Sequence, residues 1–158
     1  AKKHGKKFQV YNTETRPLYQ GRITSLELAK AKINVTAFVD SAMHEAIKKS
    51  NLILLGADAI LKSGVVNKIG STAVVEIAKV HKKPFYIISD SWKFYPKSIK
   101  IEQRNEKEVW PNHPKSISIA NPAFEKIPPK YIKKIISELG ILSHADFIKK
   151  ARKNLKII

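Results

Sequence analysis

The sequence predicts a single α/β domain with a doubly wound, mainly parallel sheet and helices on both of its faces. Short apolar runs alternate with helical patterns along most of the chain, as expected when strands and helices follow one another with right-handed crossovers. Runs such as residues 52–55 lack polar–apolar alternation, so we expect strands buried on both faces. The 158 residues contain no internal repeat and no low-complexity linker, and we assign residues 1–158 to one domain.

The composition is that of a globular chain, with 43% hydrophobic and 27% charged residues. No apolar run approaches the roughly 20 residues that a membrane-spanning helix needs, and the basic start does not resemble a secretory signal. The chain has no cysteine and five scattered histidines, so we expect no metal site and no cofactor. We therefore expect a cytoplasmic protein with no membrane partner.

The formal net charge is +17, from 30 Lys and Arg against 13 Asp and Glu. One interpretation is a solvated, lysine-rich surface, and the other is attraction to RNA or to phosphorylated small molecules. The lysines are not interleaved with aromatic residues as a base-stacking surface requires. We favour the solvated surface and do not expect direct nucleic-acid binding.

The first half of the chain predicts three strands with helices between them. Residues 1–5 resemble the end of a helix closed by Gly5, which suggests a preceding segment. The strands are expected over residues 6–13, 33–39 and 52–55. The helices are expected from Thr24 or Ser25, as N-cap, to Lys32, and over residues 41–49.

The second half begins with the clearest helical pattern, over residues 67–83, which Pro84 ends. A buried strand follows at residues 85–88. Residues 95–113 are charged and interrupted by prolines, so we expect an irregular excursion. The remaining predictions are a strand at residues 117–119, a rigid turn over 121–129, a helix over 130–139 closed by Gly140, and a helix from Ser143 or His144 to about Leu155.

Polar side chains follow the ends of three predicted strands. They are Glu14, Arg16 and Gln20 after the first, Asp40 and Ser41 after the second, and Asp58 after the third. The carboxyl ends of parallel strands meet at one edge of a sheet, where open α/β sheets bind ligands. The backbone at Gly70 and Ser71 can add N–H donors and a helix dipole. This combination predicts a site for an anionic, hydroxylated ligand.

Individual residues suit that chemistry, although ordinary structural roles stay open for some. Arg16 offers a planar fork for phosphate, and burial of Asp58 would suit it to proton transfer near neutral pH. Asp40 equally suits a helix N-cap, Glu14 and Arg16 a surface ion pair, and Asn67 a turn or cap. The chain lacks Gly-x-Gly-x-x-Gly after its first strand and lacks a P-loop motif, which disfavours the usual dinucleotide and nucleoside triphosphate sites.

Six ordered motifs resemble one superfamily. They are Thr13–Pro17 with Gln20–Thr24, Val39–Ala42, Gly56–Ile60, Asn67–Ser71, Lys93–Phe94, and Asn121–Glu125 with Pro128–Ile132. In this order they are similar to the C-terminal domain of the α/β/δ regulatory subunits of eukaryotic initiation factor 2B. The same superfamily contains methylthioribose-1-phosphate isomerases and archaeal ribose-1,5-bisphosphate isomerases. The resemblance covers nearly the whole chain and implies a Rossmann-like C-terminal domain, usually preceded by a helical N-terminal domain that is absent here.

The resemblance also implies roles for individual residues. Asp58 matches the acid/base of the isomerases. The implied ligand- and phosphate-binding residues are Glu14, Arg16, Gln20, Gly21, Asp40, Ser41, Asn67, Lys68, Gly70, Ser71 and Lys93. The eukaryotic regulatory subunits mostly lose Asp58 and the loop around Arg16, so this chain is expected to keep a competent site. The isomerases pair this Asp with an upstream cysteine, which the chain lacks.

Two functions follow from the resemblance. The main interpretation is an archaeal initiation-factor-2B-like regulatory subunit that binds a sugar phosphate or nucleotide, forms a homodimer or higher oligomer and contacts initiation factor 2. The alternative is the C-terminal half of a ribose-1,5-bisphosphate isomerase, in which Asp58 moves the proton as the carbonyl shifts from C1 to C2. Without the cysteine, the chain alone is not expected to complete that reaction.

Overall fold

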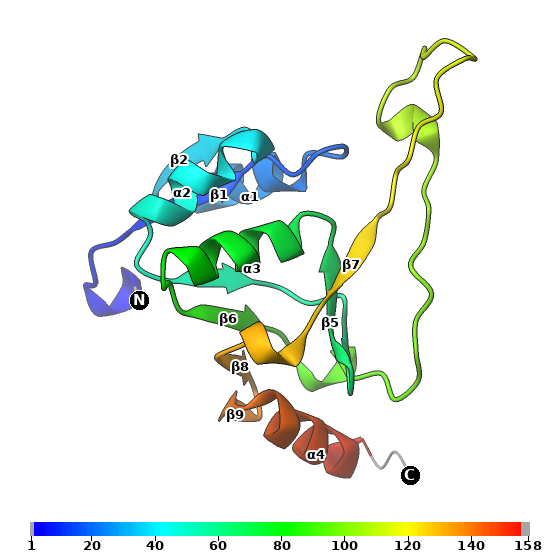
Figure 1. The fold of residues 1–158 in the computed structure, drawn as a ribbon. Helices are drawn as coiled ribbons and strands as arrows, with labels where there is room; N and C mark the ends of the chain where they lie inside the picture. Colours follow the sequence, from blue (N-terminus) through cyan, green and yellow to red (C-terminus); the bar gives the residue numbers. More distant parts are fainter. Residues whose placement is uncertain (1, 156–158) are drawn as a thin grey trace. The chain divides into compact units, whose positions relative to one another are not determined.

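The computed structural model describes residues 2–155 and shows a mixed α/β fold with parallel strands and helices (Figure 1). The chain forms two compact units. The first unit runs to Ser50 and includes Asn105–Ile119. The second comprises Asn51–Arg104 and the chain from Ala120 onward. The doubly wound layout and the assignment of one domain remain predictions.

The first unit is built around two parallel strands, β1 (Gln9–Thr13) and β2 (Asn34–Phe38). They pair in register from Gln9 opposite Asn34 to Thr13 opposite Phe38, so both carboxyl ends lie at one edge. The helical elements of this unit are η1 (Lys2–His4), α1 (Gln20–Lys30), η2 (Asp40–Ala42), α2 (Met43–Lys49) and η4 (Glu106–Glu108). The predicted strands and the short helix before Ser50 are therefore present.

Helix α1 begins earlier than predicted, at Gln20 rather than after Thr24 or Ser25. Its N-cap is Tyr19, in the left-handed conformation with φ 57°, and no side chain caps it. The Asn12 amide on β1 holds the start of the helix by donating to the Gly21 carbonyl at 2.6 Å and to Ser25 Oγ at 3.0 Å. The helix N-terminus is thus fixed by the neighbouring strand, which a search for a local cap does not detect.

The second unit contains one mixed sheet and one antiparallel sheet within the described residues. In the mixed sheet, β3 (Ile53–Leu55), β6 (Phe85–Ile88) and β8 (Lys134–Ser137) run parallel, and β9 (Gly140–Leu142) pairs antiparallel with β8. The antiparallel sheet contains β4 (Ala59–Leu61), β5 (Gly64–Lys68) and β7 (Phe124–Ile127). The helical elements are α3 (Ser71–Val80), η3 (Ser91–Lys93), η5 (Pro129–Tyr131) and α4 (His144–Asn154).

The core of the second unit lies on one face of the mixed sheet. Ile53, Phe85, Ile87 and Ile135 are buried, and helices α3 and α4 contribute buried side chains such as Val75 and Phe147. Leu54 and Ile88, which alternate with the buried positions, are each 48% exposed. The prediction of strands buried on both faces is therefore wrong for β3 and β6 in this chain. Figure 1 shows α3 lying along β3 and β6, with α4 next to β8 and β9.

The predicted helix over residues 130–139 is wrong. After the single turn of η5, this segment forms the β8–β9 hairpin, whose turn precedes Gly140 at φ 107°. Ile135 lies between β6 and β9 and is fully buried. Pro129 and Gly140 are residue types that commonly begin and end a helix. The β-branched Ile135 and Ile136 between them favour a strand, and both belong to β8.

Three other local predictions change. Residues 117–119 form no strand, and β7 lies instead within the segment predicted as a turn. Residues 59–68 form the β4–β5 hairpin, in which Gly64 follows the turn with φ 142°. Helix α3 starts at Ser71, because Asn67 and Lys68 belong to β5 and pair with Glu125 and Phe124. Strand β6, the irregular residues 95–113 outside η4, and helix α4 with its Ser143 N-cap agree with the predictions.

Candidate functional site

The loop after β1 in the first unit is held by the Asp40 carboxylate. Oδ1 accepts a hydrogen bond from the Thr15 N–H at 2.8 Å, and Oδ2 accepts one from the Arg16 N–H at 2.6 Å. Thr15 has φ 60°, a conformation that a β-branched residue rarely adopts. Asp40 is neither the N-cap of η2, which is Val39, nor a free ligand group. It stabilises a strained loop at the edge where β1 and β2 end.

Arg16 points its guanidinium at groups of the first unit. It donates to the Tyr19 hydroxyl at 2.8 Å and to the Val109 carbonyl at 2.8 Å. The predicted Glu14–Arg16 pair does not form, because Glu14 accepts from the Arg22 guanidinium at 2.6 Å instead. Arg22 also lies 3.9 Å from the centroid of the Tyr19 ring. The loop therefore presents two guanidinium groups around one tyrosine, an arrangement suited to binding phosphate.

Gly21 is required where α1 begins against the end of β1. A Cβ at this position would lie 1.7 Å from the Thr13 carbonyl oxygen, so any side chain would collide with the strand. The neighbouring Gln20 side chain is exposed, as is Ser41 at the end of β2. The structure thus brings Glu14, Arg16, Gln20, Gly21, Asp40 and Ser41 to the carboxyl edge of the β1–β2 pair.

Asp58 lies in the second unit, between the carboxyl end of β3 and the start of β4. Its backbone N–H donates to the Val66 carbonyl at 2.9 Å, which anchors it to β5. Partial burial raises the pKa of the Asp58 carboxyl, while the positive charges of Lys93 and Lys68 act to lower it. Asp58, Lys68 and Lys93 are thus electrostatically coupled. A carboxyl with a raised pKa next to two ammonium groups can exchange a proton with a bound anionic ligand.

The N-terminus of α3 is already occupied by a carboxylate of the protein. Glu125 on β7 accepts a hydrogen bond from the Thr72 N–H at 2.8 Å. Asn67 donates to Ser71 Oγ at 2.8 Å, and that hydroxyl donates to the Lys68 carbonyl at 2.6 Å. The predicted group Asn67, Lys68, Gly70 and Ser71 is therefore brought together, but Asn67 and Ser71 have partners within the protein.

A second carboxylate positions the turn that carries Lys93. Glu138, in the β8–β9 turn, accepts from the Ser91 N–H at 2.9 and 3.2 Å. Hydrogen bonding to the Ser91 side chain, and secondarily to its backbone N–H, lowers the pKa of Glu138. Glu138 and Glu125 were not predicted as site residues. Glu125 belongs to the Asn121–Glu125 motif, so the sequence offered a signal for it. No motif or pattern in the sequence indicates a role for Glu138.

Two kinds of feature are absent from the described part of the chain. Residues 2–155 contain no group of three or more His, Cys, Asp or Glu side chains arranged to hold a metal ion. None of the helices in that range is both long and apolar enough to cross a membrane.

Comparison with protein families places this chain among known proteins. Residues 1–144 match the model of the initiation factor 2 subunit family. The chain belongs to the initiation factor 2 subunit family. The superfamily that the motifs indicate is therefore confirmed.

Curated members of the initiation factor 2 subunit family include enzymes and a translation factor. The chain is 41% identical to a ribose 1,5-bisphosphate isomerase of Methanocaldococcus jannaschii over 87% of this chain and 47% of the relative. It is 36% identical to a methylthioribose-1-phosphate isomerase of Exiguobacterium sibiricum, over 92% of this chain and 46% of the relative. It is 35% identical to the translation initiation factor eIF2B subunit alpha of Dictyostelium discoideum, over 88% of this chain and 48% of the relative. The chain spans about half the length of these relatives.

Solved structures of the family share the fold. The structure described as translation initiation factor eIF-2B, subunit delta, from A. fulgidus superposes with a TM-score of 0.88 at 31% identity, over 97% of this chain and 49% of that one. A 5-methylthioribose 1-phosphate isomerase from Pyrococcus horikoshii superposes with a TM-score of 0.86 at 26% identity, over 99% of this chain and 48% of that one. The mixed α/β fold with parallel strands is thus that of the family.

Proposed function

We propose that this chain is the C-terminal half of an aldose–ketose sugar-phosphate isomerase that acts on ribose 1,5-bisphosphate. The observation that carries the proposal is Asp58, a carboxyl with a raised pKa that is coupled to Lys68 and Lys93. The 41% identity to a ribose 1,5-bisphosphate isomerase supports it. The main interpretation of the sequence is a regulatory subunit, but the curated relatives favour the isomerase alternative.

The proposed reaction opens the sugar ring and moves its carbonyl from C1 to C2. Asp58 takes and returns the proton, and its raised pKa keeps both protonation states accessible closer to neutral pH. In the first unit, Arg16 binds phosphate after exchanging its contacts with Tyr19 and Val109 for phosphate oxygens, and Gln20 offers a further hydrogen bond. In the second unit, Lys68, Lys93 and the Gly70 and Ser71 amides offer hydrogen bonds and positive charge.

Turnover of ribose 1,5-bisphosphate, followed by NMR with the full-length protein encoded by the gene, tests the enzyme proposal. Asp58→Asn should abolish turnover and leave the fold intact. Glu27→Gln, on the exposed side of α1, is the matched control and should retain full turnover. Unchanged turnover in Asp58→Asn would refute the acid/base assignment. Absence of a cysteine from the encoded protein would remove the pairing partner that the family resemblance implies.

Binding can be measured with the chain itself. Calorimetry with ribose 1,5-bisphosphate should detect a heat of binding. Arg16→Ala should remove this heat, and Lys149→Ala, at an exposed position of α4, should preserve it. AMP and GDP serve as comparison ligands. No heat with any of the three would count against a ligand site.

The second candidate is a regulatory subunit of the initiation-factor type. It is supported by the likeness to the structure described as eIF-2B subunit delta. This function expects ligand binding without turnover, self-association into a dimer or higher oligomer, and contact with initiation factor 2. Light scattering and co-purification with initiation factor 2 measure these properties. A monomeric mass by light scattering, together with no co-purification of initiation factor 2, would exclude this candidate.

A further inference from the structure

A pocket of about 410 Å³ lies in the second unit, at the edge of the mixed sheet opposite Asp58. Its walls come from the last turn of α3, the start of β6 and the segment from η5 to the start of β8. Asp58 follows the carboxyl end of β3, whereas Phe85 in this pocket is the first residue of β6 and pairs with Ile53, the first residue of β3. The pocket is therefore distinct from the proposed isomerase site.

Five lysines surround this pocket and no acidic residue lines it. The lysines are Lys79, Lys82, Lys83, Lys130 and Lys133. Within residues 2–155, no carboxylate forms an ion pair with any of the five. Lys79 lies in the last turn of α3 and Lys82 in the turn just after the helix, where positive charge complements the helix dipole. That explanation does not extend to Lys130 and Lys133, which come from another segment.

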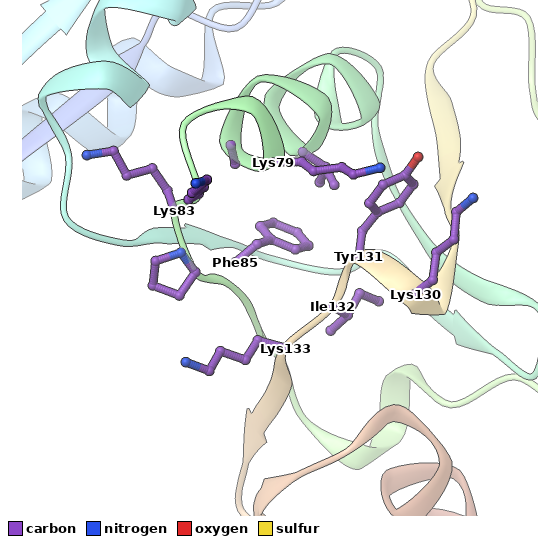
Figure 2. Close-up of a pocket in the computed structure, with 11 residues that line it drawn as sticks. Lys79, Lys83, Phe85, Lys130, Tyr131, Ile132 and Lys133 are labelled. Atoms are coloured by element: carbon purple, nitrogen blue, oxygen red, sulfur yellow. The ribbon is translucent and has the colours of Figure 1, made fainter.

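The interior of the pocket is apolar and partly aromatic. Figure 2 shows Phe85 in its centre, with Lys83 and Lys133 toward one end and Lys79, Tyr131 and Lys130 toward the other. The ammonium groups of Lys79 and Lys130 lie 5.6 and 5.1 Å from the centroid of the Tyr131 ring. Val75 and Ile132 complete the apolar lining, and both are buried.

The spacing of the charges discriminates between ligands. A single phosphate group needs donors that converge on one point. Here the labelled ammonium groups stand at opposite ends of an apolar centre (Figure 2). A ligand that matches this arrangement has negative charges on both sides of an apolar group. The pocket volume of about 410 Å³ can hold that apolar group. Like charges held close together without counter-ions also favour an anionic partner.

We propose that this lysine-rimmed pocket binds an acidic peptide segment of a partner protein, with one aromatic or aliphatic anchor residue seated between Phe85 and Tyr131. Aspartate or glutamate residues before and after the anchor pair with the two groups of lysines. The net charge of +17 increases the rate at which an acidic partner reaches the pocket. Association is therefore fastest at low salt.

The probe is a short synthetic peptide with one phenylalanine flanked on both sides by aspartates, titrated into the ¹⁵N-labelled chain. Amide shifts should concentrate in residues 79–85 and 130–133. Lys79→Glu combined with Lys130→Glu should weaken binding by about tenfold or more, as loss of charge pairing predicts. Lys149→Glu combined with Lys153→Glu on α4 is the matched control, because it changes the net charge equally and lies outside the pocket.

Each contrary outcome overturns the proposal. Equally weakened peptide binding in the two double variants would show that the net positive charge of the chain, and not the pocket, attracts the peptide. Equal binding of a peptide with asparagines in place of the aspartates would show that charge is not recognised. Shifts confined to other residues would exclude the pocket. An RNA oligonucleotide that shifts the same amides at lower concentration would identify nucleic acid as the preferred partner.

Discussion

At the scale of single residues, the acidic side chains of the proposed sites have different tasks. Asp40 uses both carboxylate oxygens to hold the Thr15 and Arg16 amides, and Glu125 binds the Thr72 amide. Asp58 has no side-chain hydrogen bond among the described residues and carries the raised pKa. The carboxylates with backbone partners shape the loops, and Asp58 is left for chemistry.

Replacing Asp40 with asparagine should loosen the loop after β1. One oxygen of the amide can still accept a hydrogen bond, but the NH₂ group then faces a backbone N–H donor. A loss of about 1–3 kcal/mol of unfolding free energy is expected, with faster hydrogen exchange at Thr15 and Arg16. Glu27→Gln should change neither quantity. Unaltered exchange in Asp40→Asn would mean that the loop is held by other contacts.

Gly21→Ala should be strongly destabilising. The new Cβ would lie 1.7 Å from the Thr13 carbonyl oxygen, so β1 and α1 must move apart. We expect a loss of roughly 2 kcal/mol or more by urea unfolding. Gly56→Ala is the matched control, because no atom lies within 4 Å of its Cβ. Similar losses in the two variants would show that the close approach at Gly21 is not required.

At the scale of elements, the strands and helices that follow simple local rules could be predicted. The apolar runs of β2, β3 and β6 and the Ser143 cap of α4 are local signals. The β8–β9 hairpin could not be predicted from the sequence. The segment between Pro129 and Gly140 has helical spacing, but its residues suit a helix or a hairpin equally well. Pairing of β8 with β6 makes it a hairpin. The start of α1 depends on Asn12, which is distant in sequence.

Helix α4 supplies a pH dependence through His144. Its Nε2 lies 2.8 Å from the Leu61 carbonyl oxygen, and burial lowers the pKa of this imidazole. The unfolded chain takes up a proton near pH 6.5, while the folded chain does so only at lower pH. Stability from this group is therefore full above about pH 6.5 and falls on acidification toward the folded pKa.

Urea unfolding at several pH values, with the wild-type chain and His144→Gln, isolates this contribution. The wild type should lose more stability between about pH 7.5 and 5.5 than the variant. Parallel curves for the two proteins would show that His144 does not carry the dependence.

At the scale of the whole molecule, sequence motifs identified the family and many candidate residues but not how those residues are used. Order along the chain is a one-dimensional signal, and it was sufficient to recognise the superfamily. Hydrogen bonds such as Asp40 to Arg16 or Glu138 to Ser91 join residues far apart in sequence, so neither follows from composition or spacing.

The net charge of +17 should make stability depend on salt. Repulsion between the excess positive charges opposes the compact state, and salt screens it. The thermal midpoint should therefore rise as sodium chloride increases from about 20 to 300 mM, over which the screening length falls several-fold. A midpoint that falls over that range would indicate that favourable ion pairs outweigh the repulsion.

The Asp40 contacts also have a kinetic consequence. A loop that is already fixed in the free protein does not have to wait for a rare conformer before it can accept a ligand, and no fraction of the binding energy is lost to selecting one. In stopped-flow mixing, the observed association rate should therefore increase in proportion to ligand concentration. In Asp40→Asn, it should level off at a ceiling set by loop closure.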